Sequence, residues 1–256
     1  KNTRSAGGYG LRIDNSGAGN ANDERYALGV YTPGNTGFFI RNNGKVGIGT
    51  TAPSELLHLV AAGSGPEVRL QNSSGSHYIR AYNDNWNFLA NASNVAMTIK
   101  NSGNILTPNQ TFFSVKRSGN QTVAASSWVT VVWNSETTDT GGNFASNTFT
   151  APVAGKYMLS AKMVVAQIDH DGAYYAQFQI VTSNRDYSVN YSVRDFFEAQ
   201  PELWTFQVAV VADMDASDTA FVRYRESGPG ASQTDVYNAN SSTAQEQHQF
   251  NGYLLG

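Results

Sequence analysis

Hydrophobic and polar residues alternate in short stretches along the second half of the chain. From Tyr187 to Val193, apolar side chains occupy every second position, with serine or asparagine between them. A period of two predicts a half-buried β-strand. Further strand candidates, each bounded by polar turn residues, are residues 121–133, 144–150, 157–167, 174–181, 203–212, 220–225 and 247–255. About eight to ten strands, with no helix beyond one turn at residues 196–202, predict a two-sheet sandwich or jelly roll.

The first half of the chain contains two pairs of similar phrases at nearly the same spacing. Residues 11–17 (LRIDNSG) resemble residues 68–74 (VRLQNSS), and residues 40–46 (IRNNGKV) resemble residues 99–105 (IKNSGNI), at offsets of 57 and 59. These matches favour a duplicated module of about 58 residues, built of short strands joined at Asn-Gly and Ser-Gly turns. Chance similarity within an asparagine-rich sequence is the alternative.

A change in composition near residue 111 separates the two halves. Glycine and asparagine make up 31 of the first 111 residues and 18 of the last 145, and the net charge changes from +3 to −6. We therefore predict a repetitive β-rich shaft over residues 1–111, with modules at about 8–60 and 66–110, and a globular head over residues 112–256. Because such short modules have little core of their own, we expect them to bury surface against identical chains.

Composition and charge exclude several classes of protein. The chain is 40% hydrophobic and 14% charged, which permits a real core and favours strands over charged amphipathic helices. A net charge of −3 provides no basic surface for a nucleic-acid backbone, and no apolar run is long enough to insert into a membrane. Because cysteine is absent, disulfides, thiol catalysis and cysteine-bound zinc are excluded.

One phrase in the first half resembles a known kind of fibre. Residues 44–53 (GKVGIGTTAP) and 56–59 (LLHL) are similar to a phrase common in the shafts of phage tail fibres and related fibrous surface proteins. Physically, the phrase predicts a strand interrupted by glycines where chains approach closely, then a turn at Pro53 and another short strand. The resemblance implies an extracellular position in a virion tail fibre. Since the chain begins without methionine, we expect a missing N-terminal part that contacts other virion tail proteins.

The second half resembles a different family. Residues 112–115 (FFSV), 149–157 (FTAPVAGKY), 218–222 (DTAFV) and 250–255 (FNGYLL) are similar, in order and spacing, to strands of the complement first-component q globular head and, more distantly, of the tumour-necrosis-factor superfamily. The resemblance covers almost all of residues 112–256 and implies a ten-stranded jelly roll that forms a homotrimer. Phages are among the users of such heads. Met158 and Leu159 replace the usual aromatic residues, and a collagen-like stalk is lacking, which argues against a complement function.

Two acidic segments carry candidate chemistry. Residues 169–172 (DHDG) combine carboxylates with an imidazole, which could serve as acid and base or ligate a metal, but a polar hairpin is the preferred interpretation. The spacing of Asp213, Asp215 and Asp218 suits calcium, although an ordinary turn is preferred, and the presence of a metal stays open. The four histidines are scattered, and no nucleophile or phosphate-binding motif is present.

These observations predict a binding protein without cofactor or enzymatic activity. A polysaccharide depolymerase would need paired carboxylates in a groove, usually on a long parallel β-helix that this chain is too short to contain. The expected function is that of a phage fibre tip whose trimeric head binds a host surface receptor, a glycan, through its loops. A structural cap of the trimer and a secreted cellular adhesin of the same fold are the alternatives.

The candidate receptor-binding residues lie in five predicted loops, residues 134–143, 169–172, 183–187, 194–203 and 226–243. They are Asp139, Asp169, His170, Asp171, Asp186, Tyr187, Asp195, Asp235, Tyr237 and Asn238.

Aromatic residues of the head could stack on sugars or fill the core. They are Trp128, Trp133, Trp204, Tyr174, Tyr175 and Phe178, and core packing is the preferred interpretation for most of them. Adjacent Tyr174 and Tyr175 must point to opposite sides of a strand, so one of them faces outward. Tyr157 is predicted to occupy a core or trimer-contact position.

Overall fold

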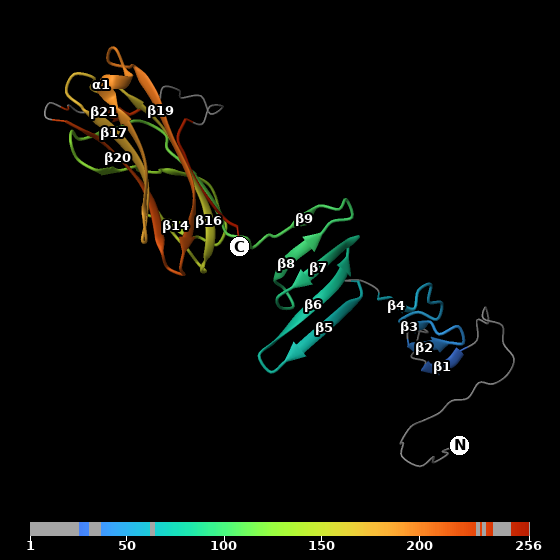
Figure 1. Cartoon of the computed structure of the whole chain (residues 1–256). Helices are drawn as coiled ribbons and strands as arrows, with labels where there is room; N and C mark the ends of the chain where they lie inside the picture. Colours follow the sequence, from blue (N-terminus) through green and yellow to red (C-terminus); the bar gives the residue numbers. More distant parts are fainter. Residues whose placement is uncertain are drawn as a thin grey trace. The chain divides into compact units, whose positions relative to one another are not determined.

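The computed structural model describes residues 26–30, 37–61, 65–228, 231, 234–237 and 247–255 (Figure 1). Strands form nearly all of its regular structure, and one short helix, α1 (Val193–Phe196), occurs among the described residues. The predicted all-β fold class is confirmed. The chain divides into two compact units, Lys1–Pro108 and Asn109–Gly256. In the described part, no helix is long and apolar enough to cross a membrane.

The first sheet of the N-terminal unit has four strands, β1 (Tyr26–Val30), β2 (Phe38–Arg41), β3 (Val46–Ile48) and β4 (Leu57–Leu59). The first three are antiparallel, and β4 joins β3 in parallel. Phe39 is fully buried. Gly49 allows two backbone segments of the same chain to approach closely. Its φ is +77°, and an added Cβ would lie 1.9 Å from the carbonyl oxygen of Val60.

The second sheet of this unit is an antiparallel meander of β5 (Glu67–Asn72), β6 (Gly75–Tyr82), β7 (Asn85–Leu89), β8 (Val95–Ile99) and β9 (Ile105–Leu106). Residues directly opposite each other project from the same face. One face carries two apolar rows, Val68, Ile79, Phe88 and Met97, and then Ala81, Trp86, Ile99 and Ile105. The other face carries the Glu67–Arg80 ion pair and the hydrogen bond from Thr98 to Asn87.

One of the two repeated phrases forms the same hairpin in both sheets. The turns at residues 41–45 and 100–104 each contain two backbone hydrogen bonds between equivalent positions, at 2.8 to 3.0 Å. Gly44 and Gly103 have φ of +83° and +85°, a conformation that glycine adopts readily. Residues 11–17, part of the other pair, lie outside the described residues, so the duplicated module stays a prediction.

The C-terminal unit, the head, contains two sheets. The first has the order β11-β21-β16-β22-β10-β13, with β19 on the other edge of β16. The second has the order β14-β15-β20-β17-β18, with β12 also paired to β20. The chain crosses repeatedly between the sheets, from β15 to β16 to β17 and from β18 to β19 to β20 (Figure 1). This connectivity confirms the jelly roll: the ten expected strands are present, with β11, β12 and β21 as short additions.

The strands of the head have the following bounds: β10 (Phe112–Lys116), β11 (Gln121–Val123), β12 (Val129–Thr130), β13 (Ser135–Asp139), β14 (Phe144–Ala145), β15 (Thr148–Thr150), β16 (Gly155–Ala166), β17 (Tyr175–Thr182), β18 (Asp186–Ser192), β19 (Leu203–Met214), β20 (Thr219–Ser227), β21 (Thr234–Val236) and β22 (Gln249–Leu254).

Aromatic side chains fill the space between the two sheets. The ring of Phe113 stacks on Phe149 at 4.6 Å between centroids and on Phe144 at 5.2 Å, and it meets Phe250 edge-on at 4.9 Å. Tyr157 is fully buried, and its hydroxyl donates a hydrogen bond to the carbonyl oxygen of Val153 (2.8 Å). Tyr157 therefore occupies the core, one of its two predicted positions.

The outer face of the first head sheet carries an exposed apolar row. Phe112 is opposite Tyr253, Tyr253 is opposite Met158, and Met158 is opposite Val211, so four side chains from four adjacent strands line up. All four are exposed within the chain. We call them the outer row.

Several sequence-based boundaries are wrong. The polar segment 134–143, predicted as one loop, contains β13, whose backbone pairs with β10. The strand predicted over residues 144–150 is a hairpin of β14 and β15 that turns at Ser146 and Asn147, both at positive φ. The loop predicted over residues 226–243 is interrupted by β21. The helical turn predicted over residues 196–202 begins three residues earlier, at Val193, and ends at Phe196.

Candidate functional site

Two connections meet at one end of the head. Between β16 and β17, the carboxylate of Asp169 accepts a hydrogen bond from the backbone N–H of Gly172 (2.9 Å), which closes a tight turn. His170 Nε2 lies 2.9 Å from the carbonyl oxygen of Phe197, in the connection between β18 and β19. The imidazole therefore joins the two connections. Residues 169–172 form a polar turn that crosses between the sheets, so the predicted hairpin is wrong: β16 and β17 belong to different sheets and do not pair with each other.

An exposed tyrosine and an arginine lie against this junction. The guanidinium of Arg194 lies 4.6 Å from the ring centre of Tyr174 and donates a hydrogen bond to the carbonyl oxygen of Asp171 (2.6 Å). The carboxylate of Asp171 lies 2.9 Å from His170 Nδ1 and is almost fully exposed. We call Tyr174, Arg194, Asp171 and His170 the Tyr174 patch. Its cation–π contact and hydrogen bonds fix the ring and the charges relative to one another.

A cluster of aromatic rings supports a second exposed ring beside the patch. Phe196, in α1, is 56% exposed, and its ring packs edge-on against Trp204 (5.1 Å), Phe197 (5.2 Å) and Tyr191 (5.7 Å). Such edge-to-face pairs hold the ring in one orientation. In the same helix, the carboxylate of Asp195 accepts a hydrogen bond from the Ser192 hydroxyl (2.6 Å).

A buried glutamate holds the base of the 169–172 turn. Glu226 is 1% exposed; its carboxylate accepts hydrogen bonds from the Tyr224 hydroxyl (2.8 Å) and from the backbone N–H of Asp169 (3.2 Å). Burial raises the pKa of Glu226 above its usual value, although these hydrogen bonds act in the opposite direction. Burial also raises the pKa of Tyr224 well above 10, and the neighbouring Glu226 raises it further.

Sequence reasoning missed Glu226, although the sequence contains a signal for it. Along β20, Ala220, Val222 and Tyr224 alternate with exposed or half-buried residues, and Glu226 takes the next inward position. A carboxyl group that continues an apolar series must find partners inside the fold.

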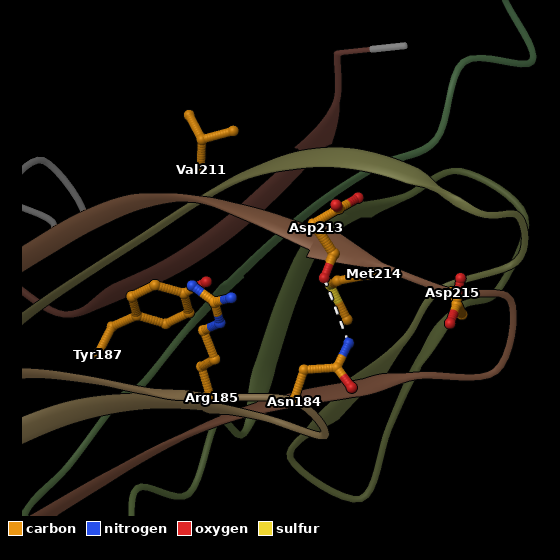
Figure 2. Close-up of a pocket in the computed structure, with 7 residues that line it drawn as sticks. All are labelled: Asn184, Arg185, Tyr187, Val211, Asp213, Met214 and Asp215. Carbon is orange, nitrogen blue, oxygen red and sulfur yellow. Dashed lines mark hydrogen bonds between the residues drawn. The ribbon is translucent and has the colours of Figure 1, made fainter.

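A pocket opens at the other end of the same strands, where β17 turns into β18 and β19 ends (Figure 2). It has a volume of about 380 Å³ and is lined by Asn184, Arg185, Tyr187, Val211, Asp213, Met214 and Asp215. Figure 2 shows Arg185 beside the ring of Tyr187, with Asn184 bonded to the backbone of Asp213. We call it the Arg185 pocket.

The acidic segment that borders this pocket is a turn. Asp218 accepts hydrogen bonds from the backbone N–H of Asp215 (2.8 Å) and from the side chain of Asn184 (2.7 Å), so its carboxylate is used within the turn. The turn interpretation is thus confirmed for residues 215–218, whereas Asp213 and Met214 end β19. Among the described residues, no group of three or more histidine, cysteine, aspartate or glutamate side chains could hold a metal ion.

A buried histidine holds the segment around Tyr237, and sequence reasoning missed it. His248 Nδ1 accepts the backbone N–H of Val164 (3.2 Å), and Nε2 lies 2.9 Å from the carbonyl oxygen of Tyr237. Val164 lies between the stretches of β16 that pair with β21 and with β22, so the imidazole replaces a strand partner there. Burial lowers the pKa of His248 from 6.5 to about 4, so the ring is neutral at pH 7.

The remaining candidate residues lie apart from one another. Asp186 forms an ion pair with Arg223 (2.7 Å), and the Asp139 carboxylate accepts two backbone N–H groups of the turn after β13. Asp235 is in β21, with one carboxylate oxygen buried and unpaired within the described residues. Asn238 lies outside the described residues.

The structure thus places Asp169, His170, Asp171 and Asp195 at one end of the head and Tyr187 in the Arg185 pocket. The nine described candidates do not form one site. Sequence reasoning also did not select Arg185 or Arg194 as candidates, because their exposure and orientation depend on the tertiary fold.

Comparison with known proteins gives structural neighbours only. No protein-family model and no curated protein matches the chain. The globular domain of zebrafish complement 1qA protein is 17% identical, with a TM-score of 0.38, and the match covers 57% of this chain and 98% of that one. Murine APRIL is 12% identical, also with a TM-score of 0.38, and the match covers 57% of this chain and 99% of that one.

Proposed function

We propose that this chain is the receptor-binding end of an extracellular fibre on a virion tail, and that its head binds a glycan on the host surface without cleaving it. The observation that carries the proposal is the Tyr174 patch beside Phe196. Two exposed rings and fixed charges of both signs lie there at the loop end of a rigid sandwich.

The chemistry of the patch suits a sugar. An exposed aromatic ring can stack on the apolar C–H face of a pyranose, and Tyr174 and Phe196 are 49% and 56% exposed. The Asp171 carboxylate accepts hydrogen bonds from sugar hydroxyls, whereas Arg194 donates them. Because these groups are already held by neighbouring contacts, little conformational entropy is lost on binding.

The proposed assembly is a homotrimer. The outer row exposes four aligned apolar residues, and one face of the β5–β9 sheet carries two apolar rows in which Val68, Trp86 and Ile105 are exposed. Burial of such surfaces against identical chains would stabilise both units by about 25 cal/mol per Å² of apolar area. Three copies of the patch would also convert weak contacts into avidity. We further propose that the fibre connects to other virion tail proteins.

The experiment replaces the two exposed rings. The double variant Tyr174→Ala with Phe196→Ser should reduce binding of the full chain to host cells by about tenfold or more, because stacking contacts of this kind contribute on the order of 1 kcal/mol each and act in three copies. Tyr82→Ala is the matched control, since Tyr82 is an exposed tyrosine of the other unit. Unchanged binding by the double variant would contradict the site, and release of soluble sugar from host polysaccharide would contradict the non-enzymatic proposal.

The second candidate function is a structural cap that only registers the three chains. The outer row favours it as strongly as it favours a receptor-binding tip, because trimer contacts alone would use that surface. A glycan array probed with the full chain and with the double variant separates the two functions. If the chain is only a cap, the full chain and the double variant should give the same array result, with no glycan bound by the full chain alone.

A further inference from the structure

The Arg185 pocket combines one unpaired cation with two carboxylates and an aromatic wall. Its base is held firmly: the Thr182 hydroxyl donates to the carbonyl oxygen of Arg185 (2.9 Å) and accepts its backbone N–H (3.0 Å). Thr182 itself is buried. The start of the Arg185 side chain is therefore fixed, although the side chain is exposed.

The guanidinium of Arg185 has no partner within the described residues, unlike neighbouring arginines. Arg223 bonds to Gln179 and Asp186, and Arg225 bonds to Gln177 and Tyr175. An arginine whose backbone is held in place and whose guanidinium is unpaired can bind an anion from solution. Planar guanidinium binds a carboxylate through two parallel hydrogen bonds.

The rest of the pocket restricts what kind of anion can bind. The ring of Tyr187 provides an apolar wall, which suits the C–H face of a sugar. Asp213 and Asp215 contribute carboxylates that accept hydrogen bonds from hydroxyl groups and repel additional negative charge. Asp213 is only weakly neutralised by Lys156, since the 3.7 Å pair is largely exposed. A singly charged carboxylate on a hydroxylated ring fits this arrangement better than a phosphate monoester, which carries up to two negative charges.

We propose that the Arg185 pocket binds an acidic sugar unit, a hexuronate within a polysaccharide. Arg185 would bind the carboxylate, Tyr187 would stack on the ring, and Asp213 and Asp215 would accept its hydroxyls. A volume of about 380 Å³ is within the range of small-molecule sites. The proposal rests on the proposed glycan-binding function but assigns a separate site, at the opposite end of β17 and β18 from the Tyr174 patch.

The test uses a tetramer of galacturonic acid, titrated into the full chain by calorimetry. Wild type should bind it, and Arg185→Gln should weaken binding by about tenfold or more, because a hydrogen bond to a charged group contributes on the order of 1.5 to 3 kcal/mol. Arg185→Lys should retain part of the affinity. The matched control Arg69→Gln removes the same charge from an exposed arginine of the other unit and should leave binding unchanged.

Two further ligands define the chemistry. The carboxyl-reduced tetramer should not bind, and a tetramer of the same length with phosphate monoesters in place of the carboxylates should bind more weakly than the uronate. Equal binding of the reduced tetramer, tighter binding of the phosphorylated one, or an unaffected Arg185→Gln variant would each overturn the proposal. Titration of the Tyr174→Ala variant separates this site from the proposed function, because uronate binding should persist in that variant even where host-cell attachment is lost.

Discussion

Single buried polar side chains decide how the loops of the head are held. Tyr157 ends in a hydrogen bond to Val153, Glu226 holds the turn at Asp169, and His248 substitutes for a strand partner at Val164. Each satisfies a backbone group that the sheets leave open, and each therefore contributes more than its contact area suggests.

Replacement of the Tyr157 side chain should destabilise the head through loss of packing. Tyr157→Ala removes a fully buried ring and should reduce the free energy of unfolding by about 3 to 5 kcal/mol. Tyr157→Phe removes only the hydroxyl and should cost about 1 kcal/mol. Chemical denaturation measures both; a loss below about 0.5 kcal/mol for the alanine variant would contradict the core position.

Acid should destabilise the head through His248. Its pKa is about 4 in the folded chain and 6.5 ordinarily, so between these values the unfolded chain binds a proton that the folded chain does not. Stability from this group is therefore complete above pH 6.5 and is lost as pH falls toward 4, by up to about 3 kcal/mol.

The control for this prediction is His248→Gln, which cannot titrate. Thermal melts of wild type and variant between pH 7 and pH 4 give two slopes of melting temperature against pH. Glu226, whose raised pKa acts in the opposite direction, contributes to both slopes, so its contribution cancels in their difference. Parallel slopes would contradict the role of His248.

Residues whose role depends on local pattern could be predicted, and those whose role depends on distant partners could not. Tyr157 was predictable because it lies in the 149–157 phrase, whose resemblance to a known family implied its position. His248 was not, because Val164, its partner, is 84 positions away. Arg185 and Arg194 differ from other exposed arginines only in what lies beside them in the fold.

At the scale of elements, regular alternation predicted the long strands well. β16, β18 and β19 agree with the predicted strands to within two residues at each end. β13 could not be predicted, since its serine, glutamate and threonine side chains are polar and its pairing with β10 is remote in sequence. The 144–150 hairpin was missed because its turn consists of Ser146 and Asn147 without glycine.

The repeated hairpin gives a prediction for single glycines. Gly103→Ala should reduce the free energy of unfolding of the N-terminal unit by about 1 kcal/mol, because φ of +85° is unfavourable for alanine while no atom lies within 4 Å of the added Cβ. Gly75→Ala is the matched control, with equal space and no positive φ, and should change stability little. Equal effects in denaturation experiments would show that backbone conformation is not the cause.

At the scale of the whole molecule, assembly should depend on the outer row. Met158→Glu places a charge in the middle of four aligned apolar residues and should convert the proposed trimer into monomers, since burial of an unpaired carboxylate is costly. Val153→Glu places the same charge on an exposed apolar residue outside the row. Sedimentation equilibrium should give three chains of 27.7 kDa for wild type and control. A monomeric wild type would contradict the assembly.

The head should also fold without the N-terminal unit. Residues 109–256 form one compact unit with its own aromatic core, so this fragment alone should show a single cooperative melting transition. A fragment that lacks near-ultraviolet circular dichroism at neutral pH would contradict this independence.

The strands β17 and β18 fix the distance between the Tyr174 patch and the Arg185 pocket. β18 has seven residues. The six steps between its first and last residue, at about 3.4 Å each, separate its ends by about 20 Å. If both proposed sites bind one kind of polymer, a polymer long enough to reach from one end of β18 to the other would be held twice by one head, whereas a short fragment of identical chemistry would be held only once. Discrimination by chain length would then need no additional contacts, because the backbone of a sheet does not stretch.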